Sequence, residues 1–228
     1  MPKRMPSADI DIPRQVLESI KSADVESTIV LIGSAARNAM TWRSDIDLMI
    51  ITLTPVKKLS APQRIHLHFE ARSRFLSRLS KGDEFVAWAV RFGRVLYDPT
   101  GWWNEVLRKE ARWPDWRQKI GHIERRLRTA SVAIIDGDQD AAEEELMMAA
   151  SHCARALLLG RGEFPLSRPE LAGQLTAVGQ RRLATLLTQL IEGGNDLAFC
   201  KQGFAFLNHI SRELRLTAAK DAYAAAGA

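Results

Sequence analysis

Two aspartates at the start of an apolar run constrain the fold of this chain more than any other feature. Asp45 and Asp47 flank Ile46, and the residues from 46 to 53 are mostly β-branched or otherwise apolar, which predicts a strand. Because side chains alternate along a strand, both carboxylates are expected on one face. Aspartate is depleted in strands, and two like charges repel unless a cation lies between them. The pattern therefore predicts a sheet that holds a divalent cation.

A second apolar run, residues 28–32, ends in a glycine-serine turn shortly before the aspartates. Gly33 has no side chain, so a ligand can approach its backbone closely. Ser34 offers a hydroxyl and an N–H, and the following residues favour a helical turn whose free N–H groups suit an anion. Arg37 adds a charge suited to phosphate. A phosphate-binding turn beside two carboxylates is typical of Mg²⁺-dependent phosphoryl or nucleotidyl transfer.

Together these residues resemble the nucleotidyltransferase signature of the DNA polymerase β superfamily, most of all its minimal and aminoglycoside nucleotidyltransferases. The resemblance covers roughly residues 25–100, and turn, spacing and strand context agree. Asn38 stands where the small members commonly have glycine. This departure is mild, because asparagine tolerates the left-handed backbone conformation better than other non-glycine residues.

The resemblance implies a nucleotide site and a metal site. The nucleotide-binding residues would be Gly33, Ser34, Arg37 and Ser44, with ATP as the expected substrate. Asp45 and Asp47 would be catalytic and would bind Mg²⁺, with two ions expected. The reaction implied is transfer of a nucleoside monophosphate to a hydroxyl of an acceptor.

The family also needs a third carboxylate on a neighbouring strand. The sequence predicts a long helix over residues 60–81 and then a strand over residues 85–92. Glu84 opens this strand, whereas Asp83 would point to the opposite face, and register cannot be fixed from sequence. By resemblance, Glu84 would be a catalytic residue, either a third metal ligand or the base that deprotonates the acceptor. Asp83 stays open as the alternative.

We expect two domains with a boundary in the turn cluster at residues 98–101. Residues 11–100 predict an α/β (α+β) nucleotidyltransferase domain with a mixed sheet, preceded by a disordered lead-in at residues 1–10. Residues 101–228 predict an all-α helical bundle, in which Ser167 and Glu170 form a capping box. The bundle is expected to choose the acceptor.

Composition narrows the class of protein without naming a partner. A formal net charge of +5 suits a polyanionic ligand such as a nucleotide, and also suits RNA. Cys153 and Cys200 stand far apart in helical patterns, so we expect reduced, buried thiols and neither a disulfide nor a zinc site. No apolar run reaches membrane-spanning length and no signal-peptide core follows Met1, so we expect a cytoplasmic protein without a membrane partner. A homodimer stays open.

Other constellations give weaker signals. His66 and His68 lie two apart on the predicted helix and would point in different directions, which argues against a shared metal. Arg117 and His122 have the Arg-x4-His spacing of HEPN ribonucleases, but this spacing is common. Five tryptophans near the domain boundary predict interdomain packing, with a stacking wall for an adenine or acceptor ring as the alternative. They are Trp88, Trp102, Trp103, Trp113 and Trp116.

The acceptor itself has no signature in the sequence. A small molecule is expected ahead of a protein or an RNA. Two other functions stay open, namely a toxin–antitoxin component and a catalytically weak nucleotide-binding or interaction module that keeps the nucleotidyltransferase fold.

Overall fold

The chain forms two compact units, Met1–Pro114 and Asp115–Ala228, which we call the sheet unit and the helical unit. The computed structural model describes residues 12–41, 44–53, 59 and 61–226. The lead-in expected at residues 1–10 lies outside them. The division falls after residue 114 and not at residue 100, because Trp102 and Trp103 are buried and pack on Phe75 of the sheet unit.

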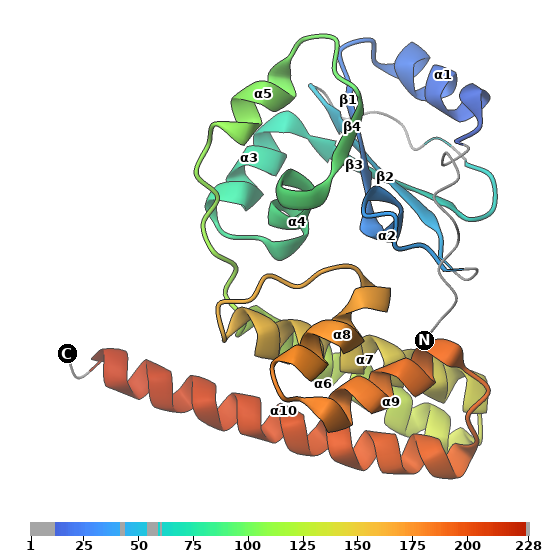
Figure 1. Ribbon diagram of the computed structural model, residues 1–228, viewed down its shortest axis with the longest axis vertical. Coiled ribbons are helices and arrows are strands. Elements are labelled where there is room, and N and C mark those ends of the chain that lie inside the picture. Colours follow the sequence, from blue (N-terminus) through green and yellow to red (C-terminus); the bar gives the residue numbers. More distant parts are fainter. Residues whose placement is uncertain (1–11, 42–43, 54–58, 60, 227–228) are drawn as a thin grey trace. The chain divides into compact units, whose positions relative to one another are not determined.

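The sheet unit contains a mixed four-stranded sheet in the order β3-β2-β1-β4 (Figure 1). Its strands are β1 (Thr28–Ile32), β2 (Ile46–Thr52), β3 (Ile65–Ala71) and β4 (Arg94–Tyr97). β1 is antiparallel to β2 and β4, whereas β2 is parallel to β3. β1 is buried along its whole length, which is expected for a central strand with an unbroken apolar sequence. The prediction of a mixed sheet is confirmed.

Helices cover both faces of this sheet, with α3 and α4 on one side and α1 on the other in Figure 1. The helices of the unit are α1 (Arg14–Ala23), α2 (Gly33–Ala36), α3 (Arg72–Ser80), α4 (Glu84–Phe92) and α5 (Trp102–Leu107). Val16 and Ile20 of α1 are buried, as are Phe75 and Leu79 of α3. The sheet therefore has a core on each face.

The long helix expected over residues 60–81 is wrong. The structure has β3 over its middle part, and α3 begins only at Arg72. Apolar Ile65, Leu67 and Phe69 alternate with polar residues in this segment, which is the period of a strand. All seven residues of β3 pair with β2, so sheet pairing adds long-range hydrogen bonds that a helix would not make.

The strand expected over residues 85–92 is also wrong, because this segment forms helix α4. Asp83 caps the helix, and its carboxylate accepts a hydrogen bond of 3.1 Å from the Val86 N–H. An aspartate at this position stabilises the first turn of a helix. Nine mostly apolar residues suit a buried helix as well as a strand, so the cap decides between them.

The helical unit is a bundle of five helices among the residues described. They are α6 (Gln118–Asp136), α7 (Gln139–Leu159), α8 (Arg168–Ala177), α9 (Arg181–Glu192) and α10 (Leu197–Ala226). The predicted capping box is present at α8. The Ser167 side chain accepts a hydrogen bond from the Glu170 backbone N–H, and the Glu170 side chain accepts one from the Ser167 backbone N–H. Both cysteines are buried free thiols, and burial raises the pKa of Cys153 to about 12.

Four tryptophans near the domain boundary, namely Trp88, Trp102, Trp103 and Trp116, have partners inside their own units. Trp88 packs on Phe92 at 5.2 Å between ring centroids, and Trp116 packs against the core of the helical unit. Within the described residues, no helix is long and apolar enough to cross a membrane.

Candidate functional site

Asp45 directly precedes β2 and Asp47 is its second residue, where the sequence predicts them. Asp47 pairs with Ile32, so it lies beside the residue that precedes Gly33. A Cβ placed on Gly33 would be only 2.8 Å from Asp47 Oδ2, closer than real side chains approach. The carboxylate of Asp47 therefore lies directly against the backbone of the turn, and a glycine is required there.

The turn that follows β1 has the strained conformation that its sequence allows. Gly33 has φ +71° and Asn38 has φ +53°, both in the left-handed region. Asn38 thus adopts the conformation for which glycine is usual, as the comparison with the small nucleotidyltransferases suggests. The Ser34 carbonyl accepts the N–H groups of Arg37 at 3.2 Å and Ala39 at 2.9 Å, which folds the segment back on itself.

Two residues predicted to bind nucleotide also have structural contacts. The guanidinium of Arg37 lies over the ring of Phe92, 4.8 Å from its centroid. The Ser44 hydroxyl accepts the Thr41 N–H at 2.9 Å.

The neighbouring strand β3 presents histidines to the aspartates. His66 is the cross-strand partner of Asp47, and His68 lies two residues further along the same face. Asp47 Oδ1 is 3.1 Å from His68 Nε2 and 3.6 Å from His66 Nδ1. The expectation that these histidines point in different directions is wrong, because it rested on a helix where the structure has a strand.

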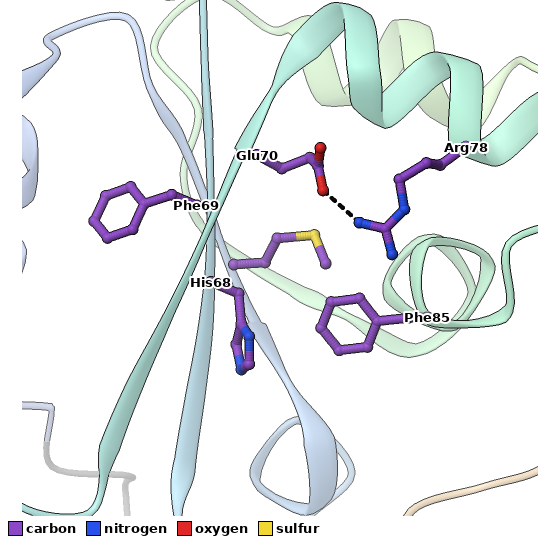
Figure 2. Close-up of a pocket in the computed structure, with 6 residues that line it drawn as sticks. His68, Phe69, Glu70, Arg78 and Phe85 are labelled. Atoms are coloured by element: carbon purple, nitrogen blue, oxygen red, sulfur yellow. Dashed lines mark hydrogen bonds and ion pairs between the residues drawn. The ribbon is translucent and has the colours of Figure 1, made fainter. Parts of the chain in front are cut away.

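A pocket of about 250 Å³ continues from His68 along β3 toward α3 and α4. It is lined by Met49, His68, Phe69, Glu70, Arg78 and Phe85. Figure 2 shows Glu70, Arg78 and Phe85 on one side of β3 and Phe69 on the other. Glu70 forms ion pairs with Arg78 and, at 3.0 Å, with Arg74. This carboxylate shares the face of Asp47 but binds α3 instead of the aspartate site.

Neither candidate for the third carboxylate lies on a strand. Glu84 is the first residue of α4, and only 6% of it is exposed. Asp83 caps the same helix and forms an ion pair of 3.1 Å with Arg78. The strand that was to bring Glu84 beside β2 does not exist, so the argument for its catalytic role no longer holds.

The residues that do lie beside Asp47 were not predicted from the sequence. The alternation from Ile65 to Glu70 is the signal that would have found them, since it predicts His66, His68 and Glu70 on one face of a strand. Among the residues described, no group of three or more His, Cys, Asp or Glu side chains is arranged to hold a metal ion.

Arg117 and His122, which have the spacing of HEPN ribonucleases, contact different residues. Arg117 pairs with Asp115 at 3.4 Å and with Asp221 at 3.3 Å. His122 stacks on His152, with 5.1 Å between ring centroids. The two residues thus have different partners within the helical unit.

Comparisons with known proteins assign part of the chain to a family. Residues 13–129, just over half of the chain, match the model of a family described as a nucleotidyltransferase domain. No curated protein matches the chain significantly. Among solved structures, a nucleotidyltransferase-like protein from Exiguobacterium sibiricum 255-15 is similar, with 18% identity and a TM-score of 0.48. The alignment covers 90% of this chain and 77% of that one.

Proposed function

The chain belongs to the nucleotidyltransferase domain family, and from this membership we propose that it transfers AMP from ATP to a hydroxyl of a small-molecule acceptor. The contact between Gly33 and Asp47 carries the proposal. It brings a turn that a phosphate can approach next to a carboxylate that can hold a divalent ion. A Cβ on residue 33 would lie only 2.8 Å from Asp47 Oδ2, so a residue larger than glycine does not fit there.

Asp45 and Asp47 are the residues that would hold Mg²⁺. Their side chains are 41% and 30% exposed, so both can reach a ligand in solvent. Mg²⁺ is usually bound by one or two carboxylates together with substrate phosphates and water. A pair of aspartates beside a turn that a phosphate can approach fits this coordination. Bound there, the ion would neutralise charge on the phosphates and polarise the α-phosphate for attack.

The remaining residues of the turn would bind and orient the triphosphate. Gly33 leaves room for the phosphates, and Ser34 contributes its backbone and hydroxyl. Arg37 supplies a fixed positive charge nearby. Glu84 is not part of the proposed site, because it lies on helix α4 and not on a strand beside β2.

A catalytically weak nucleotide-binding module is the second candidate. One observation favours it, namely that β3 carries histidines where a third carboxylate is expected beside Asp47. Such a module would bind MgATP without transferring AMP at a useful rate. The two candidates therefore differ in turnover and not in binding.

Calorimetry with MgATP tests the site first. We expect Asp45→Asn and Asp47→Asn each to weaken MgATP binding at least about tenfold, because each removes a charged ligand. Asp140→Asn is the control, since it removes the same charge from an exposed position of the helical unit. Unchanged affinity in both site variants would remove the metal assignment.

Mass spectrometry of a metabolite pool and of a cell lysate, each incubated with protein, Mg²⁺ and labelled ATP, then tests transfer. A mass gain on a small molecule that depends on Asp45 and Asp47 supports the enzyme. Tight MgATP binding without any mass gain supports the binding module. A gain on a protein or an RNA would replace the small-molecule acceptor by that class.

A further inference from the structure

Three basic residues lie beside the two aspartates, and we call them the basic row: Arg64, which directly precedes β3, and His66 and His68 within it. Asp47 pairs with His66, and Arg64 and Asp45 each stand one residue before the first paired residues, Ile65 and Ile46. Because side chains alternate along paired strands, His66, His68 and Asp47 share one face, whereas Arg64 is placed beside Asp45 by its 4.0 Å contact. Beside the aspartates, this edge of the sheet thus contributes the charge of Arg64 and imidazole nitrogens, and its carboxylate, Glu70, pairs with α3.

The row lies within contact distance of both aspartates. Arg64 Nε is 4.0 Å from Asp45 Oδ1, and the Arg64 guanidinium also donates a hydrogen bond of 2.7 Å to the Ser44 carbonyl. His68 Nε2 is 3.1 Å from Asp47 Oδ1. All three side chains of the row are at least 40% exposed, so a ligand at the aspartates could reach them.

The backbone of Arg64 is strained. Its φ is +75°, which disfavours any residue with a Cβ. Strain of this kind persists where surrounding interactions hold it, and it occurs often at ligand sites. Here it accompanies the contacts of the guanidinium with Ser44 and Asp45.

We propose that the basic row contacts the triphosphate and takes the place of a second metal ion, so that the site binds one divalent ion per nucleotide. This inference rests on the proposed function. Two carboxylates and a triphosphate carry more negative charge than one divalent ion can neutralise. The fixed charge of Arg64 and the hydrogen bonds of the imidazole N–H groups offset part of the remainder.

Counting ions on the wild-type protein, and on two histidine variants as a check, tests the proposal. Mn²⁺ is titrated into the protein with a non-hydrolysable ATP analogue, and bound Mn²⁺ is measured by electron paramagnetic resonance. We expect one ion per nucleotide. Two ions, one of which is lost in His66→Ala or His68→Ala, would show that the histidines are metal ligands and overturn the proposal while the proposed function stands. Absence of any nucleotide binding would instead remove the proposed function.

Arg64→Gln gives a second test. We expect the affinity for nucleotide and the affinity for metal without nucleotide to change in opposite directions. Nucleotide affinity should fall about ten- to hundredfold, the range for loss of a hydrogen bond to a charged group. Mn²⁺ alone should bind more tightly, because Asp45 loses a competing positive charge. A merely structural role of Arg64 would weaken both, and that result would overturn the proposal.

Arg94→Gln is the matched control for this substitution. Arg94 pairs with Leu31 of β1, whereas Asp47 pairs with the next residue, Ile32, so Arg94 lies on the opposite face of the sheet. The same charge is removed from the same unit, and both affinities should stay within about twofold of wild type. Equal losses in Arg64→Gln and Arg94→Gln would mean that general charge, and not the basic row, attracts the nucleotide.

Discussion

Replacement of Gly33 by alanine tests the contact that carries the proposed function. The new methyl group would stand 2.8 Å from Asp47 Oδ2 on a backbone with φ +71°. Two separate effects follow, which are backbone strain at residue 33 and displacement of the Asp47 carboxylate. The displaced carboxylate would also lose its 3.1 Å contact with His68.

The magnitude of each effect follows from the geometry. A left-handed φ costs a non-glycine residue about 1–2 kcal/mol. A side chain forced about 30° from its rotamer costs about 0.5–1.5 kcal/mol. A lost hydrogen bond costs about 0.5–1.5 kcal/mol. We therefore expect Gly33→Ala to lower the free energy of unfolding by about 2–5 kcal/mol.

Gly101→Ala separates the strain from the contact. Gly101 belongs to the same unit and has φ +68°, but its Cβ would meet nothing closer than Asn104 Nδ2 at 3.9 Å. This change should cost only the strain, about 1–2 kcal/mol. Both variants are compared with wild type by urea unfolding, which reports the same transition for both.

A double-mutant cycle gives the result that could refute this reasoning. In an Asp47→Ala background the carboxylate is absent, so Gly33→Ala should cost only the backbone strain. If the loss of stability is the same with and without Asp47, the carboxylate does not lie against the turn. The main support for a joined phosphate and metal site would then be gone.

Two further predictions concern the third carboxylate and the helical unit. Glu84→Gln should leave MgATP affinity unchanged and lower the free energy of unfolding by about 0.3–1 kcal/mol, because it removes a charge from the first turn of α4; a tenfold loss in calorimetric affinity would return Glu84 to the site. Because burial raises the pKa of Cys153 to about 12, the folded state keeps a proton that the unfolded thiol loses above about pH 8.5. Stability should therefore fall with rising pH by up to about 1.4 kcal/mol per unit. Urea unfolding at about pH 8 to 10 should show a flatter slope for Cys153→Ala, and equal slopes would contradict the assignment.

Local signals account for the parts of the fold that the sequence predicts well. β1 is predicted at its true ends, and β2 differs by one residue, because both are β-branched, apolar runs with clear boundaries. The left-handed Asn38 and the capping box at α8 depend only on residues within a turn. These features need no knowledge of distant contacts.

The errors fall where the deciding interaction is distant or ambiguous. The helix expected over residues 60–81 overlooked the alternation of β3, an edge strand that pairs with β2. α4 has a composition that suits strand and helix equally. The aspartates and Gly33 belong to one motif and were found, whereas the basic row depends on the register of β3 against β2 and was missed.

The basic row changes the argument that two neighbouring aspartates repel each other unless a cation lies between them. In the free protein, Asp45 lies near Arg64 and Asp47 contacts His68, so the two carboxylates need no cation between them. A metal ion must then compete with Arg64 for Asp45. A nucleotide bound at the turn offers Arg64 a phosphate partner and so removes this competition. Ion and nucleotide should therefore strengthen each other's binding, and thermodynamic linkage requires that the two effects be equal. A site built in this way takes up the ion together with its nucleotide.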